Sequence, residues 1–118
     1  MTEALNQVRQ AALDLPETEE RLSHGQPTFF VAGKQFAQFR DNHHGDAKTV
    51  VCVRVSSFDE QSMLIEADPA TYSKPAYLPS WISINLVGNG VDWDRVADRI
   101  AASWELAAPR RLLEAGGR

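Results

Sequence analysis

The first regular pattern in the chain is a stripe of apolar residues at the spacing of an α-helix. Residues three or four positions apart lie on the same face of a helix. The stripe consists of Leu5, Val8, Ala12 and Leu15. Thr2 suits the N-cap position, and Pro16 cannot continue a helix. The pattern therefore predicts a helix from Thr2 to Asp14.

The next stretch, from Glu19 to Val55, consists of short segments rich in β-branched and aromatic residues, separated by turn residues. Such segments are typical of strands joined by hairpins. The predicted strands are Glu19–His24, Thr28–Val31, Lys34–Arg40 and Lys48–Val55. Their short connections favour an antiparallel meander over crossover connections.

A second helix is predicted directly after the meander. Ser57 and Glu60 match a capping box, in which the two side chains satisfy each other's free backbone N–H groups. The helix should end at Ala67, because Asp68-Pro69 disfavours its continuation.

The last part of the chain predicts a fifth strand and a third helix. The strand is Trp81–Leu86, and Asp92 suits the N-cap of the helix that follows. The apolar face of this helix consists of Val96, Ile100, Trp104 and Ala107. Val91 and Val96 have the spacing of a hydrophobic staple. Pro109 should end or kink the helix, leaving a frayed tail to Arg118.

The order of elements, α-β-β-β-β-α-β-α, predicts an α+β fold. Its two layers are an antiparallel sheet of about five strands and a set of helices on one face. The 118 residues suit a single domain over residues 1–118. With 43% hydrophobic and 24% charged residues, the composition is that of a globular protein.

Targeting signals and cysteine usage favour the cytoplasm as the compartment. The first ten residues lack the basic and apolar regions of a secretion signal. No apolar run approaches the roughly 20 residues of a membrane span, so no membrane association is expected. Cys52 is the single cysteine and cannot form an internal disulfide.

Charge is segregated along the chain. The segment from Arg21 to Arg54 carries five cations and two acids, a balance of +3, and it contains all three histidines. The remainder carries seven cations and fourteen acids, so the net charge is −4. The overall acidity disfavours non-specific nucleic-acid binding, whereas the basic segment allows a local contact with an anion.

Alternation along the strands predicts a polar and aromatic surface on the face without helices. Ile82, Ile84 and Leu86 should face the helices, as should Val51, Val53 and Val55, together with Ala37 and Phe39. The opposite face should then display Phe36, Gln38, Arg40, Arg54, Trp81 and Asn85. This mixture of rings, guanidinium groups and amides suits planar ligands or nucleobases. Alternatively, the face is buried in a homodimer or under the loop from Tyr72 to Ser80.

No recognised catalytic or cofactor motif occurs in the chain, which is therefore not expected to be an enzyme or to hold a cofactor. His43 and His44 could suggest a metal site, but a turn of polar residues explains them more simply. Cys52 is expected to be structural, and His24 to belong to a turn.

The loop from Tyr72 to Trp81 contains two prolines, two tyrosines and a tryptophan. A stiff aromatic loop of this kind either shapes a pocket or covers a sheet edge.

Several fragments resemble the MmcQ/YjbR-like family over nearly the whole chain, chiefly by their order and spacing. They are Leu15-Pro16-Glu17-Thr18-Glu19-Glu20, Ser23-His24-Gly25-Gln26-Pro27-Thr28-Phe29, Gly33-Lys34-Gln35-Phe36-Ala37, Ala67-Asp68-Pro69, Trp81, Val91-Asp92-Trp93 and Ala107-Ala108-Pro109-Arg110-Arg111-Leu112. The resemblance implies a two-layer α+β fold like that of double-wing DNA-binding domains and secretion chaperones.

The resemblance also implies two kinds of function. Members are commonly labelled DNA-binding, and a namesake associated with mitomycin resistance suggests small-molecule binding. The family has no agreed catalytic residues. Many members have a histidine just before the tyrosine of the proline-aromatic loop, where this chain has Ala76.

Three hypotheses for a small, non-catalytic binding protein follow. The first is nucleic-acid binding by Lys34, Arg40, Lys48 and Arg54, with Phe36 and Trp81 as stacking surfaces. The second is a pocket for a small planar ligand between the sheet face and the Tyr72–Trp81 loop. The third is a protein-interaction domain or homodimer. The candidate binding residues are Lys34, Phe36, Gln38, Arg40, Lys48, Arg54, Tyr72, Tyr77, Trp81 and Asn85.

Overall fold

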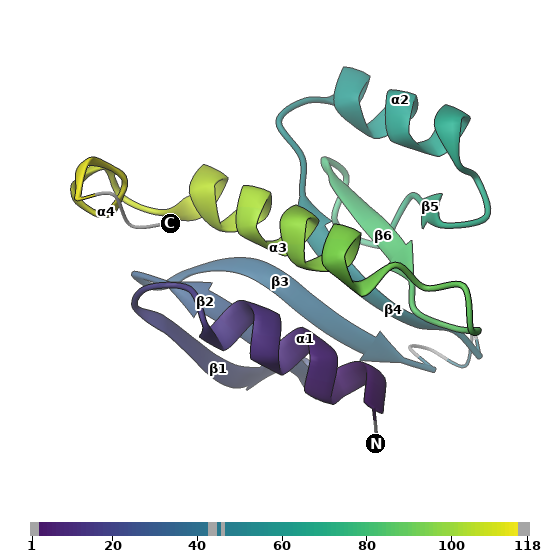
Figure 1. Cartoon of the computed structure of the whole chain (residues 1–118), viewed down its shortest axis with the longest axis horizontal. Helices are drawn as coiled ribbons and strands as arrows, with labels where there is room; N and C mark the ends of the chain where they lie inside the picture. The colour runs from purple at the N-terminus through teal and green to yellow at the C-terminus, as the bar shows by residue number, and fades with distance from the viewer. Residues whose placement is uncertain (1–2, 43–44, 46, 116–118) are drawn as a thin grey trace.

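A six-stranded antiparallel sheet forms the centre of the structure, a computed structural model that describes residues 3–42, 45 and 47–115 (Figure 1). The strands are β1 (Thr18–Ser23), β2 (Gln26–Val31), β3 (Lys34–Asp41), β4 (Thr49–Arg54), β5 (Tyr72–Ser73) and β6 (Trp81–Asn85). Their order in the sheet is β1-β2-β3-β4-β6-β5. The helices are α1 (Glu3–Leu13), α2 (Phe58–Ala67), α3 (Trp93–Ala107) and α4 (Arg110–Glu114).

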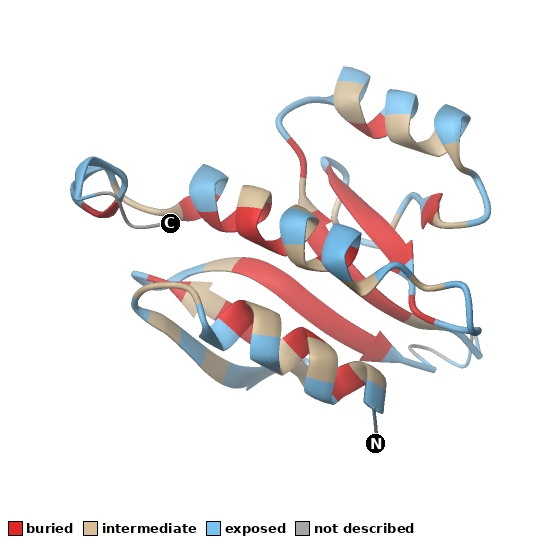
Figure 2. Ribbon diagram, in the orientation of Figure 1, coloured by how far each residue is buried: buried red, intermediate tan, exposed pale blue. Residues whose placement is uncertain are grey.

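The main core lies between the sheet and the two helices α1 and α3. Both helices run across the same face of the sheet, whereas α2 lies beyond β6 (Figure 1). Buried residues concentrate on β3, β4 and β6 and on the sheet-facing sides of α1 and α3 (Figure 2). Trp104 is fully buried there, and its indole N–H donates to the Pro16 carbonyl at 3.0 Å. This bond ties α3 to the end of the α1 segment.

The α+β class and the predicted order of elements are confirmed. Two short elements were missed: β5, which has two residues, and α4, which replaces the frayed tail expected after Pro109. The N-cap proposed for Thr2 and the turn containing His43 and His44 lie outside the described residues.

Two tight turns set the register of the first three strands. His24 and Gly25 have φ angles of +54° and +77°, and Ala32 and Gly33 have φ angles of +50° and +79°. Two consecutive positive φ angles define the type I′ turn, whose twist matches that of a hairpin. His24 therefore belongs to a turn, as expected.

Both predicted helix caps form, one of them in an altered way. The Asp92 side chain accepts from the Arg95 N–H at 3.1 Å, and the Ser57 hydroxyl accepts from the Glu60 N–H at 3.1 Å. The Glu60 carboxylate does not return to Ser57. It accepts instead from the N–H and hydroxyl of Ser56, at 2.7 and 2.9 Å.

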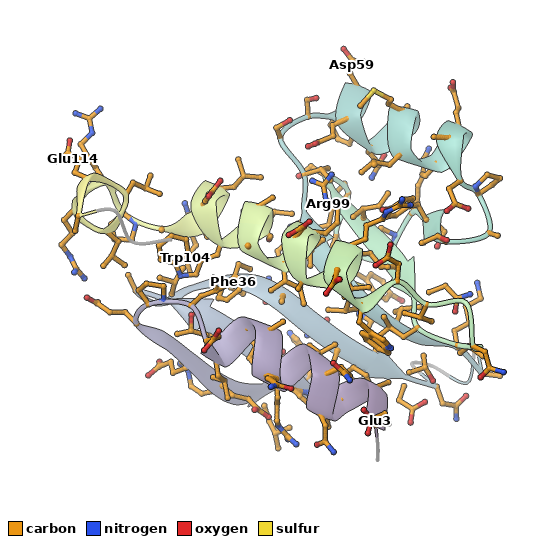
Figure 3. The ribbon with its side chains drawn as sticks, viewed as in Figure 1. Glu3, Phe36, Asp59, Arg99, Trp104 and Glu114 are labelled. Atoms are coloured by element: carbon orange, nitrogen blue, oxygen red, sulfur yellow. The ribbon has the colours of Figure 1, made fainter. Side chains whose placement is uncertain are left out.

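A bulge in β3 changes the side-chain pattern of that strand. Phe29 pairs with Ala37, but Phe30 pairs with Gln35, so Phe36 has no partner on β2. An extra residue of this kind reverses the alternation beyond it. Phe36 and Ala37 consequently both belong to the main core, and Figure 3 shows Phe36 near Trp104 in the space between β3 and α3.

Candidate functional site

The segment from Lys74 to Ser80 packs against part of the sheet face opposite α1 and α3. A second, small apolar cluster forms there from Val50, Cys52 and Trp81, with Leu78 packed against it. Trp81 is 5% exposed, and Cys52 is fully buried. Around Trp81, the loop therefore covers the sheet face, as one of the two alternatives from the sequence predicted.

Arg54 and Trp81 lie on the same face of the sheet, as the alternation predicted. They are Cα partners across β4 and β6. The Arg54 guanidinium carbon lies 5.0 Å from the centroid of the Trp81 ring, a cation–π contact. Its Nε donates to the Gln35 carbonyl at 2.8 Å. Partial burial lowers the pKa of Arg54 from its ordinary value.

Two of the predicted binding residues are misplaced. Phe36 was expected on the helix-free face but is fully buried in the main core, because the bulge turns it toward α3. Tyr72 was expected in the pocket under the loop, but it is 4% exposed and also packs in the main core. Its cross-strand partner is Ile84, so the two side chains share the helix-facing side. Neither ring can stack on a ligand on the helix-free face.

A cleft of about 540 Å³ opens beside the covered cluster, and we call it the loop cleft. Its walls come from the β1–β2 hairpin, from β3 and from the loop. The lining residues are Ser23, His24, Gln26, Gln35, Gln38, Arg40, Tyr77 and Leu78. Three predicted binding residues, Gln38, Arg40 and Tyr77, therefore meet in one cleft.

Arg40 is the charged group of the loop cleft. Arg40 is 6% exposed. Its Nε donates to Gln38 Oε1 at 2.9 Å, and its Nη1 donates to the Ala76 carbonyl at 3.1 Å. Both acceptors are neutral. Within the described part of the chain, no carboxylate forms a salt bridge with Arg40. The cleft thus contains a buried cation without a protein counter-charge.

A chain of hydrogen bonds orients Gln38 toward Arg40. The Gln38 Nε2 donates to Thr28 Oγ1 at 3.1 Å and to the Ser23 carbonyl at 3.4 Å. The Thr28 hydroxyl donates in turn to the Gln26 carbonyl at 3.0 Å. Because the amide nitrogen is engaged in this way, the amide oxygen is left to accept from Arg40.

Side chains hold the loop at two points. Arg40 binds the carbonyl of Ala76, and Gln61 of α2 donates through its Nε2 to the carbonyls of Pro79 at 2.8 Å and Trp81 at 2.7 Å. Between these anchors, Tyr77 has a φ angle of +67° and is 78% exposed. Its ring stands at the rim of the loop cleft.

Three predicted residues are exposed and do not line the loop cleft: Lys34, Lys48 and Asn85. Lys48 and Asn85 border a separate hollow of about 220 Å³ next to β5. Asn85 is engaged locally, since its side chain donates to the Ala70 carbonyl at 3.4 Å and accepts from the Val87 N–H at 3.1 Å.

Five residues that line the loop cleft were not among the predicted binding residues: Ser23, His24, Gln26, Gln35 and Leu78. Gln35 was missed because the bulge places it on the same face as Gln38. The His24-Gly25 turn signal was available, but it does not say which cleft the turn borders.

The described ranges contain neither a metal-binding cluster nor a membrane-spanning helix. Within residues 3–42, 45 and 47–115, no group of three His, Cys, Asp or Glu side chains could hold a metal ion. The metal alternative considered for His43 and His44 falls outside these ranges. Within the same part of the chain, no helix is long and apolar enough to cross a bilayer.

The fold and the loop cleft define a small α+β domain in which one sheet face carries helices and the other carries a loop-covered cleft. The family model YjbR matches residues 13–106, and the chain belongs to the YjbR family. The resemblance found in the sequence is thereby confirmed.

One solved structure similar to this chain is the crystal structure of a Deinococcus radiodurans protein with the family-model domain DUF419. The two share 17% sequence identity and a TM-score of 0.71, over 86% of this chain and 76% of the other. At this identity the likeness shows the fold alone. No curated protein matches the chain.

Proposed function

We propose that the protein binds a small ligand with an anionic group and a planar body in the loop cleft. The observation that carries the proposal is Arg40, a buried guanidinium with neutral partners. Burial of a cation is costly unless a counter-charge and hydrogen bonds compensate it. A carboxylate or phosphate group on a ligand would supply the missing negative charge.

The rest of the loop cleft suits the body of such a ligand. Its volume of about 540 Å³ lies within the range of roughly 300 to 1,000 Å³ of small-molecule sites. Leu78 and the exposed ring of Tyr77 offer apolar and stacking surface. Gln35 and His24 add polar groups at the walls, which can fix the orientation of a planar ligand through hydrogen bonds.

The test is a ligand series that separates charge from shape. Indole-3-acetate and its neutral counterpart indole-3-acetamide are titrated into the protein, and amide shifts are followed by NMR. We expect the acid to perturb the amides of Ser23, Gln38 and Tyr77, and to bind at least about tenfold more tightly than the amide.

Variants locate the binding. Arg40→Gln should remove the preference for the acid, whereas Arg110→Gln, on an exposed arginine of α4, should keep it. Equal binding of the two compounds, or an unchanged preference in Arg40→Gln, contradicts the proposal. The proposal is also contradicted if no amide of the loop cleft shifts with any member of a wider panel of planar carboxylates and phosphates.

Nucleic-acid binding is a second candidate function, and a contact between an exposed arginine and a half-buried ring favours it. The Arg21 guanidinium carbon lies 4.0 Å from the Phe30 ring centroid, and the Arg21 side chain is 53% exposed. With Lys34 and Lys48, this pair offers cations and a ring outside the loop. However, Phe36 and Trp81, the proposed stacking platforms, are buried.

Fluorescence anisotropy with labelled single- and double-stranded DNA at two salt concentrations tests nucleic-acid binding. Each phosphate contact should add about 0.7 to 0.9 to the salt slope, and absence of binding at low salt ends it.

A further inference from the structure

A second cleft lies on the other side of the sheet, between α3 and the β5–β6 edge, and we call it the α3 cleft. Its volume is about 250 Å³. The floor is apolar and includes Ile84, Val91 and Val96. The polar lining includes Asp68, Tyr72, Asp92, Arg95 and Arg99. Neither the loop cleft nor its ligand uses any of these residues.

One arginine and two aspartates line the α3 cleft without forming salt bridges within the described part of the chain. Arg95 is exposed and Asp68 is half-buried. Asp92 is exposed, and its carboxylate caps α3 by accepting from the Arg95 backbone N–H at 3.1 Å. Arg99 is engaged with Glu60 of α2 through its Nη2 at 3.3 Å, and within the described residues its buried Nε has no hydrogen-bond partner. The Arg95 guanidinium and the Asp68 carboxylate, neither in a salt bridge, therefore border one small space, whereas the Asp92 carboxylate is engaged in the helix cap.

The Tyr72 hydroxyl is a further polar group at the α3 cleft, and it is independent evidence for ligand binding. The residue is 4% exposed, and its ring shares the helix-facing side with its cross-strand partner Ile84. No residue in the described ranges forms a hydrogen bond with its hydroxyl, and the hydroxyl is not among the polar atoms sealed from solvent. A buried tyrosine usually finds a partner for its O–H. Here the hydroxyl is left available to the cleft that its side chain lines.

From these three groups we infer that the α3 cleft binds a small zwitterion, namely a free amino acid with an apolar side chain. The ligand carboxylate meets the Arg95 guanidinium and the Tyr72 hydroxyl. The ligand ammonium meets the Asp68 carboxylate. The side chain rests on Ile84 and Val96. A cleft below the size of drug-binding pockets suits a ligand this small.

The experiment uses L-phenylalanine and two analogues that each lack one charge, 3-phenylpropionate and 2-phenylethylamine. Each is titrated into the protein to about 10 mM, and amide shifts are measured by NMR. We expect L-phenylalanine to shift the amides of Thr71, Tyr72 and Arg95, and both analogues to bind at least about tenfold more weakly. The inference is overturned if either analogue binds as well as the amino acid, or if these amides do not move.

Three variants assign the contacts. Arg95→Gln and Asp68→Asn should each weaken L-phenylalanine binding about tenfold or more, and Tyr72→Phe should weaken it by a smaller factor. Arg110→Gln is the control and should bind normally. Unchanged binding in both charge variants contradicts the assignment. Because Arg40 lies on the other face of the sheet, Arg40→Gln should leave this binding intact, so failure at one cleft is distinguishable from failure at the other.

Discussion

The guanidinium of Arg54 lies over the ring of Trp81, 5.0 Å from its centroid, and the two residues are Cα partners on neighbouring strands. Trp81 is the first residue of β6 and directly follows the loop that covers the sheet face. Arg54 also donates to the Gln35 carbonyl on β3. The contact therefore joins the end of the loop to two strands and to a wall of the loop cleft.

Removing this guanidinium should destabilise the fold moderately. Arg54→Gln loses a partly desolvated cation–π contact and a hydrogen bond, and we expect the free energy of unfolding to fall by about 1 to 2 kcal/mol. Urea denaturation measures the change. Arg110→Gln breaks an exposed pair at 3.8 Å and should cost less than about 0.5 kcal/mol. A double-mutant cycle with Trp81→Phe should show coupling, and additive losses would argue against the contact.

Ser103 of α3 should be more important than its size suggests. The Arg54 N–H donates to the Ser103 hydroxyl at 2.8 Å, and that hydroxyl donates to the Phe36 carbonyl. Ser103→Ala leaves both backbone groups without these partners at the bulge, so we expect a loss of about 1 to 3 kcal/mol. Chemical denaturation compares it with Ser62→Ala, on an exposed position of α2, which should be neutral or slightly stabilising. Equal stabilities would show that the bulge does not need the hydroxyl.

Arg40 should separate binding from stability. A buried cation without a protein counter-charge adds little to stability, so Arg40→Met should change the free energy of unfolding by no more than about 1 kcal/mol in either direction. Thermal and urea unfolding without ligand measure this change. A loss above about 3 kcal/mol would instead indicate that Arg40 is a structural residue with an essential partner.

Gln61 should control the order of the loop. Both of its bonds to loop carbonyls are lost in Gln61→Leu, a substitution of similar size, and we expect a loss of about 1 to 3 kcal/mol. Limited proteolysis should then cut the segment from Lys74 to Ser80 faster than in the unmodified protein. Gln10→Leu, on the exposed side of α1, is the matched control. An unchanged cleavage rate in Gln61→Leu would place the loop's anchor elsewhere.

Glu60 should make stability depend on pH in the acidic range. Hydrogen bonds from the Ser56 N–H, together with the Ser56 hydroxyl and the nearby Arg99, lower its pKa from 4.5 despite partial burial. A carboxylate with a lowered pKa stabilises the fold above its ordinary pKa, and this stabilisation is lost as the pH falls through the lowered value.

Glu60→Gln should therefore be less stable than the unmodified protein at pH 7, and the difference should shrink as the pH falls from about 5 to about 3. Urea denaturation at a series of pH values measures the difference. Asp59→Asn, the neighbouring position whose side chain points away from the fold in Figure 3, controls for the loss of a negative charge in the first turn of α2. A difference that is constant with pH would contradict the role of the Glu60 charge.

The sequence assigned side chains to the correct face of the sheet where the alternation along the strands is unbroken. β4 and β6 pair in register from Val50 with Asn85 to Arg54 with Trp81. Side chains that alternate strictly can be assigned to faces from the pattern of apolar residues alone. For this reason Arg54 and Trp81 were placed together correctly, although they are 27 positions apart in the sequence.

The errors arose where apolar residues are consecutive or where a strand is too short for a pattern. Phe29, Phe30 and Val31 are consecutive apolar residues on β2, as Phe36 and Ala37 are on β3, and several registers satisfy such runs equally well. The bulge that selects one register moves Phe36 into the core and Gln35 onto the cleft side. Tyr72 belongs to a strand of two residues, which has no period to read.

Local periodicity and capping by themselves determined the helices, most of the strands and their order, because these features depend on neighbours within a few residues. The loop cleft was decided only by tertiary structure. It depends on a bond between Arg40 and Ala76, which are 36 positions apart, and on Gln61, which reaches the loop from another helix. Closing such long segments costs conformational entropy that only the completed core can offset, so no short stretch of sequence contains this information.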